Sequence, residues 1–169
     1  MNELDLSGYK LPRYHEIPNV GLYLKQVVTF INDATEPLLH TQVTASMLSN
    51  YVKAHMVASP VKKAYDREQI ATLIFIVLAK NVLSLDNIGR TLDLQRRTTD
   101  PAVAYDFFCN KFECMLAQVS GKDVVVFPEE GLSAEAHLLK CIITTLAQKI
   151  LLDECFIRFQ MEEGASCED

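Results

Sequence analysis

A run of eleven residues from Gln69 to Ala79, QIATLIFIVLA, constrains the fold of this chain more than any other segment. Asp66 and Gln69 fit a capping box, the local signal that starts a helix. A helix that is apolar nearly all round has to be covered on every side by other elements. The run is too short, and too closely flanked by charge, to span a membrane. The sequence therefore predicts a mainly α-helical fold packed around this buried helix.

Helix-start signals recur along the chain. Thr44, Ser84 and Ser133 can each cap a helix, and Asp100 precedes a proline at a first helical position. These signals predict helices over residues 44–54, 85–92, 101–119 and 134–161.

The remaining segments carry weaker patterns. Apolar residues at helical spacing predict an earlier helix over about 20–32. Residues 1–19 are expected to be extended, and residues 33–42, which contain Pro37, should form a turn or a short helical piece. The apolar run Val124–Phe127 is short enough to be a strand or an extended connector, and the sequence does not show whether it lines a pocket.

The predicted helix 44–54 has two different faces. At 100° per residue, one side carries Met47, Leu48, Tyr51 and Ala54. The other side carries Ser46, Ser49, Asn50 and Lys53. Asn and Ser can hydrogen-bond base edges and Lys neutralises phosphate, so this polar face suits a DNA major groove. It suits plain water equally well.

Two family resemblances follow from the region around this helix. The succession Thr44, Leu48, Tyr51, Met56-Val57, Pro60, Tyr65, Ile70, Leu73 and Leu83–Ile88 resembles the winged helix-turn-helix of MerR-type regulators. The chain is also similar, over roughly residues 9–95, to domain of unknown function family 1836. That similarity is carried by Leu11-Pro12-Arg13, Leu22-Tyr23, Gln26-Val27, Asn50–Lys53, Lys62–Tyr65 and Lys80–Ser84.

The MerR resemblance implies a bacterial, dimeric, DNA-binding transcriptional regulator, with a recognition helix at about 44–54 and a basic wing at 61–67. The residues expected to contact double-stranded DNA are Thr44, Ser46, Ser49, Asn50, Lys53, Lys62, Lys63 and Arg67. Two positions depart from the MerR pattern. Ser49 replaces a usual arginine, and His55 replaces the glycine that usually ends the helix, so His55 is expected in a left-handed conformation.

The resemblance also implies a domain organisation. Residues 1–97 would form the MerR-like domain, and residues 98–161 would form a helical C-terminal region for oligomerisation or ligand sensing, with no effector identified. The acidic tail 162–169 is expected to be disordered. In the last predicted helix the apolar stripe changes face near Leu151, so the helix either kinks there or touches two different partners.

Charge is distributed unevenly. The chain has a net charge of −6, yet residues 44–97 hold eight basic and four acidic residues, a local balance of +4. The rest holds eight basic and eighteen acidic residues. A positive segment within an acidic chain is the footprint that a nucleic-acid surface requires, and two copies in a homodimer would double it.

Other functional classes find little support in the sequence. There is no glycine-rich phosphate loop, no HExxH and no G-x-S-x-G, so we expect neither an enzyme nor a cofactor. The five cysteines lack CxxC spacing and are expected to be reduced, with no metal, in a cytoplasmic protein. His137 and Cys141 supply only two ligands. The N-terminus lacks the features of a secretion signal. An alternative to DNA binding stays open: a helix-turn-helix fold whose apolar C-terminal region binds a protein partner.

Overall fold

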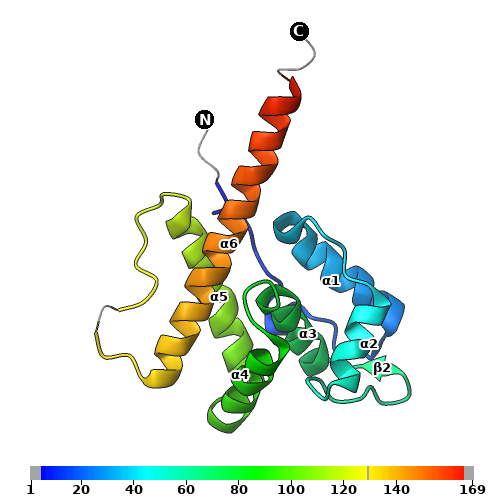
Figure 1. Cartoon of the computed structure of the whole chain (residues 1–169). Helices are drawn as coiled ribbons and strands as arrows, with labels where there is room; N and C mark the ends of the chain where they lie inside the picture. The colour runs from blue at the N-terminus through cyan, green and yellow to red at the C-terminus, as the bar shows by residue number, and fades with distance from the viewer. Residues whose placement is uncertain (1–4, 129, 166–169) are drawn as a thin grey trace. The chain divides into compact units, whose positions relative to one another are not determined.

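The computed structural model describes residues 5–128 and 130–165, and they form a mainly helical protein (Figure 1). The long elements are the helices α1 (Leu24–Leu39), α2 (Ala45–Lys53), α3 (Arg67–Ala79), α4 (Leu85–Thr98), α5 (Pro101–Val119) and α6 (Ala134–Ala165). The short ones are the 3₁₀ turn η1 (Tyr14–Glu16) and the strands β1 (Leu22–Tyr23) and β2 (Ala64–Tyr65). Within these described ranges, no helix combines the length and apolar character needed to cross a membrane.

The chain forms two compact units. The first comprises Lys10–Asn110, and the second combines the residues up to Tyr9 with those from Lys111 onward. The first unit extends to Asn110 in α5. Hydrogen bonds from Tyr14 N–H to Asp106 (2.8 Å) and from Arg13 to Asn110 (2.9 Å) attach the start of α5 to this unit. Helix α5 contributes residues to both units.

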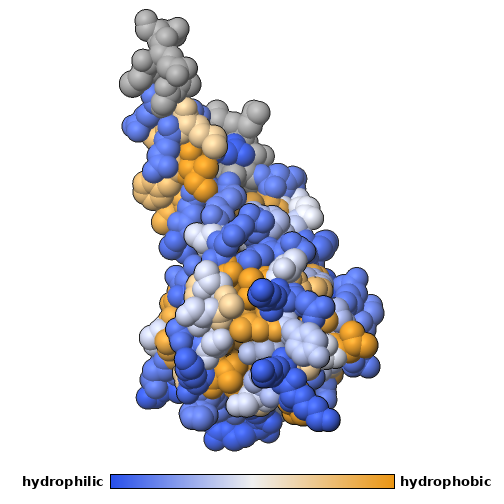
Figure 2. All heavy atoms as spheres, turned by 90° about the vertical axis from the view of Figure 1, so that its right-hand side faces the viewer, coloured by the Kyte–Doolittle hydropathy of each residue, from blue (hydrophilic) through white to orange (hydrophobic). Residues whose placement is uncertain are grey.

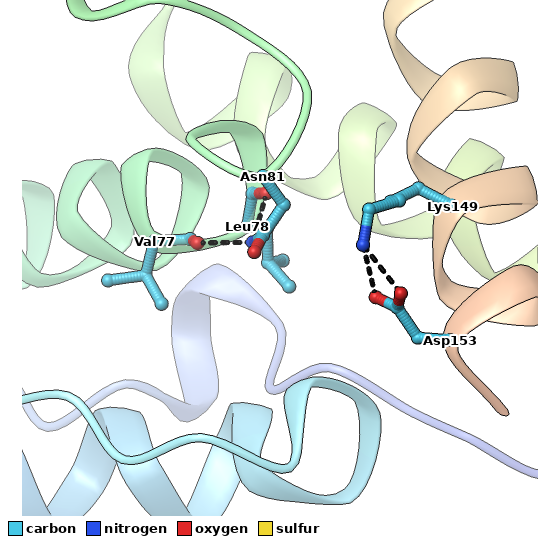
Figure 3. A network of polar contacts seen from close by, with 5 residues as sticks. All are labelled: Val77, Leu78, Asn81, Lys149 and Asp153. Atoms are coloured by element: carbon cyan, nitrogen blue, oxygen red, sulfur yellow. Dashed lines mark hydrogen bonds and ion pairs between the residues drawn. The ribbon is translucent and has the colours of Figure 1, made fainter. Parts of the chain in front are cut away.

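Helix α3 is the buried centre of the first unit, as its apolar sequence predicted. Its buried residues are Gln69, Ile70, Ala71, Leu73, Ile74, Ile76, Val77, Leu78 and Ala79. Asp66 caps the helix and Gln69 completes the expected capping box, with N–H···O distances of 2.8 Å in both directions. At the other end the Asn81 amide donates to the Val77 and Leu78 carbonyls (3.0 and 2.9 Å; Figure 3). At each end of this helix, side chains thus bond backbone groups that have no partner within the helix.

Helix α1 differs from the helix expected over 20–32. It begins later, at Leu24, because Leu22 and Tyr23 pair with β2 instead. It also continues to Leu39, so most of the segment expected as a turn or short helical piece belongs to the same helix. Pro37 is tolerated because it lies in the last turn, where it removes a single backbone hydrogen bond. His40, in a left-handed conformation, ends the helix.

Helix α4 continues past the expected end at Leu92 to Thr98. Its cap is Ser84, as expected, which accepts from Asn87 N–H at 3.2 Å. Near its other end, the Arg96 guanidinium donates to the Met56 carbonyl at 2.7 Å. Asp100 then caps α5 as predicted, and the proline after it prevents α4 from continuing.

The second unit is built on the end of α5 and on α6. Leu6 N–H donates to the Ser120 hydroxyl (3.0 Å), and the Lys111 ammonium donates to the Val126 carbonyl (2.5 Å). Val124–Phe127 is a connector and not a strand. Helix α6 runs beyond the expected end at Met161 to Ala165, so part of the tail expected to be disordered is helical. Residues 166–169 of that tail lie outside the described residues.

Candidate functional site

Helix α2 buries two of the four residues predicted for its apolar side, whereas Met47 is half-buried and Ala54, just after the helix, is exposed. Leu48 and Tyr51 are buried, and burial raises the pKa of the Tyr51 phenol. On the opposite side the candidate side chains are open to solvent: Ser46, Asn50 and Lys53 are exposed and Ser49 is half-buried. Thr44 is exposed and its hydroxyl accepts from Met47 N–H at 3.3 Å, so its first role is to cap the helix.

The end of α2 has the conformation expected for its unusual histidine. His55 has a φ of 58°, in the left-handed region. Its N–H donates to the Val52 carbonyl (3.0 Å), and Met56 N–H donates to the Tyr51 carbonyl (3.1 Å). These two bonds form a Schellman motif, which is usually completed by glycine. The chain therefore turns sharply away from α2 although no glycine is present.

Two side chains from other helices hold the segments on either side of α2. The Asn32 amide in α1 donates to the Val43 carbonyl (3.1 Å) and accepts from Val43 N–H (2.7 Å). Arg96 in α4 bonds to the Met56 carbonyl. Helix α2 is thus positioned at its start by Asn32 and just past its end by Arg96. Neither role was predicted, since each depends on a contact distant in sequence.

The basic connection 61–67 forms a small antiparallel structure with β1. Leu22 pairs with Tyr65 and Tyr23 pairs with Ala64. A further bridge joins Val61 to Ala64, with the Ala64 N–H donating to the Val61 carbonyl at 2.9 Å. The segment from Val61 to Ala64 is therefore a tight β-turn whose two central residues are Lys62 and Lys63. Both strands contact α1, which α2 also contacts.

Lys62 and Lys63 have backbone conformations that lysine rarely adopts. Their φ values are 50° and 66°, the pattern of a type I′ turn, which normally carries Asn-Gly or another glycine pair. Each left-handed residue with a side chain costs about 1–2 kcal/mol. Both lysines are exposed, and neither hydrogen-bonds nor ion-pairs with another described residue. Two unpartnered positive charges are thus presented at the tip of a strained turn.

The base of this turn is tightly packed at Gly21. A Cβ atom at Gly21 would lie 2.8 Å from the Ala64 Cβ, closer than carbon atoms can approach. Glycine is therefore required here by close approach. Next to it, Tyr23 is exposed, as is Val61 across the turn. Neither side chain was predicted as a candidate, because the strand pairing that places them beside the turn is not apparent from the sequence.

Arg67 does not share the open position of the two lysines. Its side chain is half-buried and donates to the Ile17 and His15 carbonyls (2.7 and 3.3 Å). The guanidinium also lies 5.7 Å from the centre of the Tyr14 ring, in a cation–π arrangement. The structure therefore brings Lys62 and Lys63 together at the turn and places Arg67 in contact with the η1 segment.

A shallow hollow of about 270 Å³ lies beside the end of α2. Its lining includes His55, Glu68, Thr72 and Arg96. Within the described ranges, no three His, Cys, Asp or Glu side chains are grouped closely enough to hold a metal ion.

The chain is similar to a known protein family. A family model described as a domain of unknown function, DUF1836, matches residues 12–108, which is more than half of the chain. The match covers α1 to α4, both strands and the start of α5, and it confirms the similarity that the sequence indicated for residues 9–95. No curated protein and no solved structure matches this chain.

Proposed function

Because the chain belongs to the DUF1836 family, whose description names no activity, its function has to be inferred from geometry, and we propose that it is a dimeric DNA-binding transcriptional regulator. In this proposal the first unit is a MerR-like winged helix-turn-helix, with α2 as the recognition helix and the turn 61–64 as the tip of the wing.

The lysine turn carries the proposal. Backbone strain persists where the rest of the structure enforces it, and it is concentrated at functional positions. Here the strained residues are two solvent-exposed cations, although an Asn-Gly pair would form the same turn without strain. Lysine at these positions weakens the fold and increases the local positive charge. A surface that binds phosphate explains both properties.

The polar face of α2 also supports DNA binding. The side chains of Ser46, Asn50 and Lys53 have no hydrogen-bond partner among the described residues, so their polar groups are available to a ligand. Asn can bond adenine in the major groove, Ser can bond several base edges, and Lys neutralises a phosphate. The helix is short and is anchored by Asn32 and Arg96, which suits a rigid element that inserts into a groove.

Within this proposal, three lysines provide the contacts with the DNA backbone: Lys53, Lys62 and Lys63. Arg67 stabilises the base of the wing, because its guanidinium bonds to the Ile17 and His15 carbonyls. In this proposal it does not itself bind phosphate. The net charge of residues 44–97 in one copy is only +4. The proposal therefore includes a second copy, because a dimer doubles the number of phosphate contacts and the steepness of the salt dependence.

The proposal is tested by mobility shifts with fragments of the source genome. Wild-type protein should retain specific fragments at low salt and release them as salt rises, and Lys62→Glu with Lys63→Glu should abolish the shift. A control with Lys122→Glu and Lys140→Glu in the other unit makes the same charge change and should leave the shift intact. No retention of any fragment at low salt would favour the alternative, in which the chain binds a protein partner and not DNA.

A further inference from the structure

The hollow beside the end of α2 brings together side chains from three parts of the first unit. His55 follows α2, Glu68 and Thr72 lie on α3, and Arg96 lies on α4. The volume of about 270 Å³ is just below the roughly 300–1,000 Å³ of pockets that hold drug-sized molecules. The hollow therefore suits a smaller ligand.

Two groups of opposite charge line this hollow with bonding capacity to spare. The Glu68 carboxylate forms no hydrogen bond or ion pair with another described residue. The Arg96 guanidinium uses two of its five N–H donors, one on the Met56 carbonyl at 2.7 Å and one on the Asp93 carboxylate at 3.3 Å. Its other three donors have no partner among the described residues. A ligand in the hollow thus meets both an available anion and an available cation.

His55 lines the hollow in a backbone conformation that glycine adopts more readily. Its φ is 58°, in the left-handed region. The imidazole is exposed and has no hydrogen-bond partner among the described residues. Backbone strain that persists in a folded protein is concentrated at functional positions. The chain therefore keeps an imidazole beside the hollow at a position where the fold alone favours glycine.

We propose that the hollow binds a small zwitterion of amino-acid size. The ligand carboxylate bonds to the free donors of Arg96 and to the His55 imidazole, and the ligand ammonium pairs with Glu68. Guanidinium and carboxylate groups match each other in a planar, two-bonded arrangement. The apolar carbon atoms of the ligand contact Val57 and Ala58, which also line the hollow.

The charges of the lining select a zwitterion over simpler ions. A plain anion would pair with Arg96 but be repelled by Glu68, and a plain cation would meet the reverse arrangement. Both side chains are exposed, so each ion pair contributes modestly and the expected dissociation constant is about 1 mM or somewhat lower. On the face drawn in Figure 2, hydrophobic side chains form small patches among hydrophilic ones, so that face offers no broad apolar surface for such a ligand.

This inference goes beyond the proposed function and does not depend on DNA binding. It is tested by isothermal titration calorimetry of the full chain with each of the L-α-amino acids used in proteins. At least one should bind with a dissociation constant of about 1 mM or lower. For that amino acid, the amine without its carboxylate and the acid without its amino group should each bind at least about tenfold more weakly, because each loses one charged contact.

Two outcomes of this titration would overturn the inference. One is a chain that binds no amino acid at about 10 mM. The other is an amine or an acid that binds as tightly as the amino acid itself, because a single charge would then account for recognition.

Substitutions in the hollow test the two ends of the ligand. Glu68→Gln should weaken binding at least about tenfold, whereas Glu36→Gln, the same change on α1 and outside the hollow, should alter it by less than about twofold. His55→Gly should also weaken binding, yet raise the Tm of the ligand-free chain by about 2–4 °C, because glycine adopts a positive φ without strain. Weaker binding by a more stable protein cannot result from unfolding. Unchanged affinity in Glu68→Gln would overturn the inference.

Hydrogen exchange locates the ligand. The bound amino acid should slow exchange of the amides of residues 54–58 and of the first turn of α3, because it joins the segment after α2 to α3 and α4. Protection found only in α6 would place the ligand elsewhere and overturn the inference. All of these measurements are made without DNA, so their failure leaves the DNA-binding proposal standing, and a chain that binds no DNA leaves the hollow assigned.

Discussion

Asn32 in α1 holds Val43, the residue before the cap of α2, by accepting from its N–H at 2.7 Å and donating to its carbonyl at 3.1 Å. Val43 is buried, so these two backbone groups have little access to water. Through this contact, α1 determines where the exposed face of α2 begins.

Asn32→Leu should destabilise the protein by about 2–3 kcal/mol, because it leaves a buried donor and a buried acceptor without partners. Urea denaturation measures this change. Asn50→Ala, on the exposed face of α2, removes the same type of side chain and should change stability by less than about 0.5 kcal/mol. Equal effects of the two substitutions would show that Asn32 does not position α2.

Replacing the lysine turn should separate stability from binding. Lys62→Asn with Lys63→Gly introduces residues suited to positive φ and should stabilise the fold by about 1–2 kcal/mol while weakening DNA binding. Lys62→Gln with Lys63→Gln removes the same charges without relieving the backbone strain, so it should weaken DNA binding with no gain in stability. Thermal unfolding and fluorescence anisotropy measure the two effects. An Asn-Gly variant no more stable than the Gln-Gln variant would show that Lys62 and Lys63 do not strain the backbone.

Two glycine substitutions should have opposite effects. Gly21→Ala forces a Cβ to within 2.8 Å of the Ala64 Cβ and should destabilise the protein by about 1–3 kcal/mol. Gly89 lies inside α4 with no atom within 4 Å of an added Cβ, so Gly89→Ala should stabilise it by about 0.5–1 kcal/mol. Chemical denaturation measures the free energy of unfolding and distinguishes the loss of stability from the gain. A neutral Gly21→Ala would mean that β1 and β2 do not approach as described.

Acid should remove the contribution of the Asp5 carboxylate to stability. Hydrogen bonds from Ser7, first from its side chain and then from its N–H, together with Lys122, lower the pKa of Asp5 from 3.8 to about 2. A carboxyl with a lowered pKa stabilises the fold above its unfolded pKa, and this contribution disappears as the pH falls from about 3.8 to about 2. Carboxyl NMR titration should show a midpoint near this low value. Ser7→Ala should raise the pKa more than Lys122→Gln does, and the reverse order would contradict this assignment of causes.

The sequence predicted those parts of the fold that depend on local signals. Caps at Thr44, Asp66, Ser84, Asp100 and Ser133 were correctly placed, because each depends on a side chain two or three residues from the amide it binds. The left-handed His55 was also foreseen, from its position at the end of α2.

Contacts distant in sequence were not predictable in this way. The type I′ turn lacks the Asn or Gly by which such a turn is recognised in a sequence. The pairing of β1 with β2 and the later start of α1 were therefore not predicted. Arg67 was expected to face DNA because it is basic and follows two lysines. Its bonds to Ile17 and His15 are visible only in the folded chain. The exposed Tyr23 was missed as a candidate for the same reason.

The slope of log Kd against log salt concentration, measured by fluorescence anisotropy on a fragment that shows a mobility shift, tests the central claim most directly. Each lost phosphate contact reduces the slope by about 0.9, so Lys62→Gln with Lys63→Gln should make it shallower by about 2 in a monomer and up to about 4 in a dimer. Lys122→Gln with Lys140→Gln should leave the slope unchanged. An unchanged slope in the turn variant, or an equal reduction in both variants, would contradict the assignment of Lys62 and Lys63 to DNA.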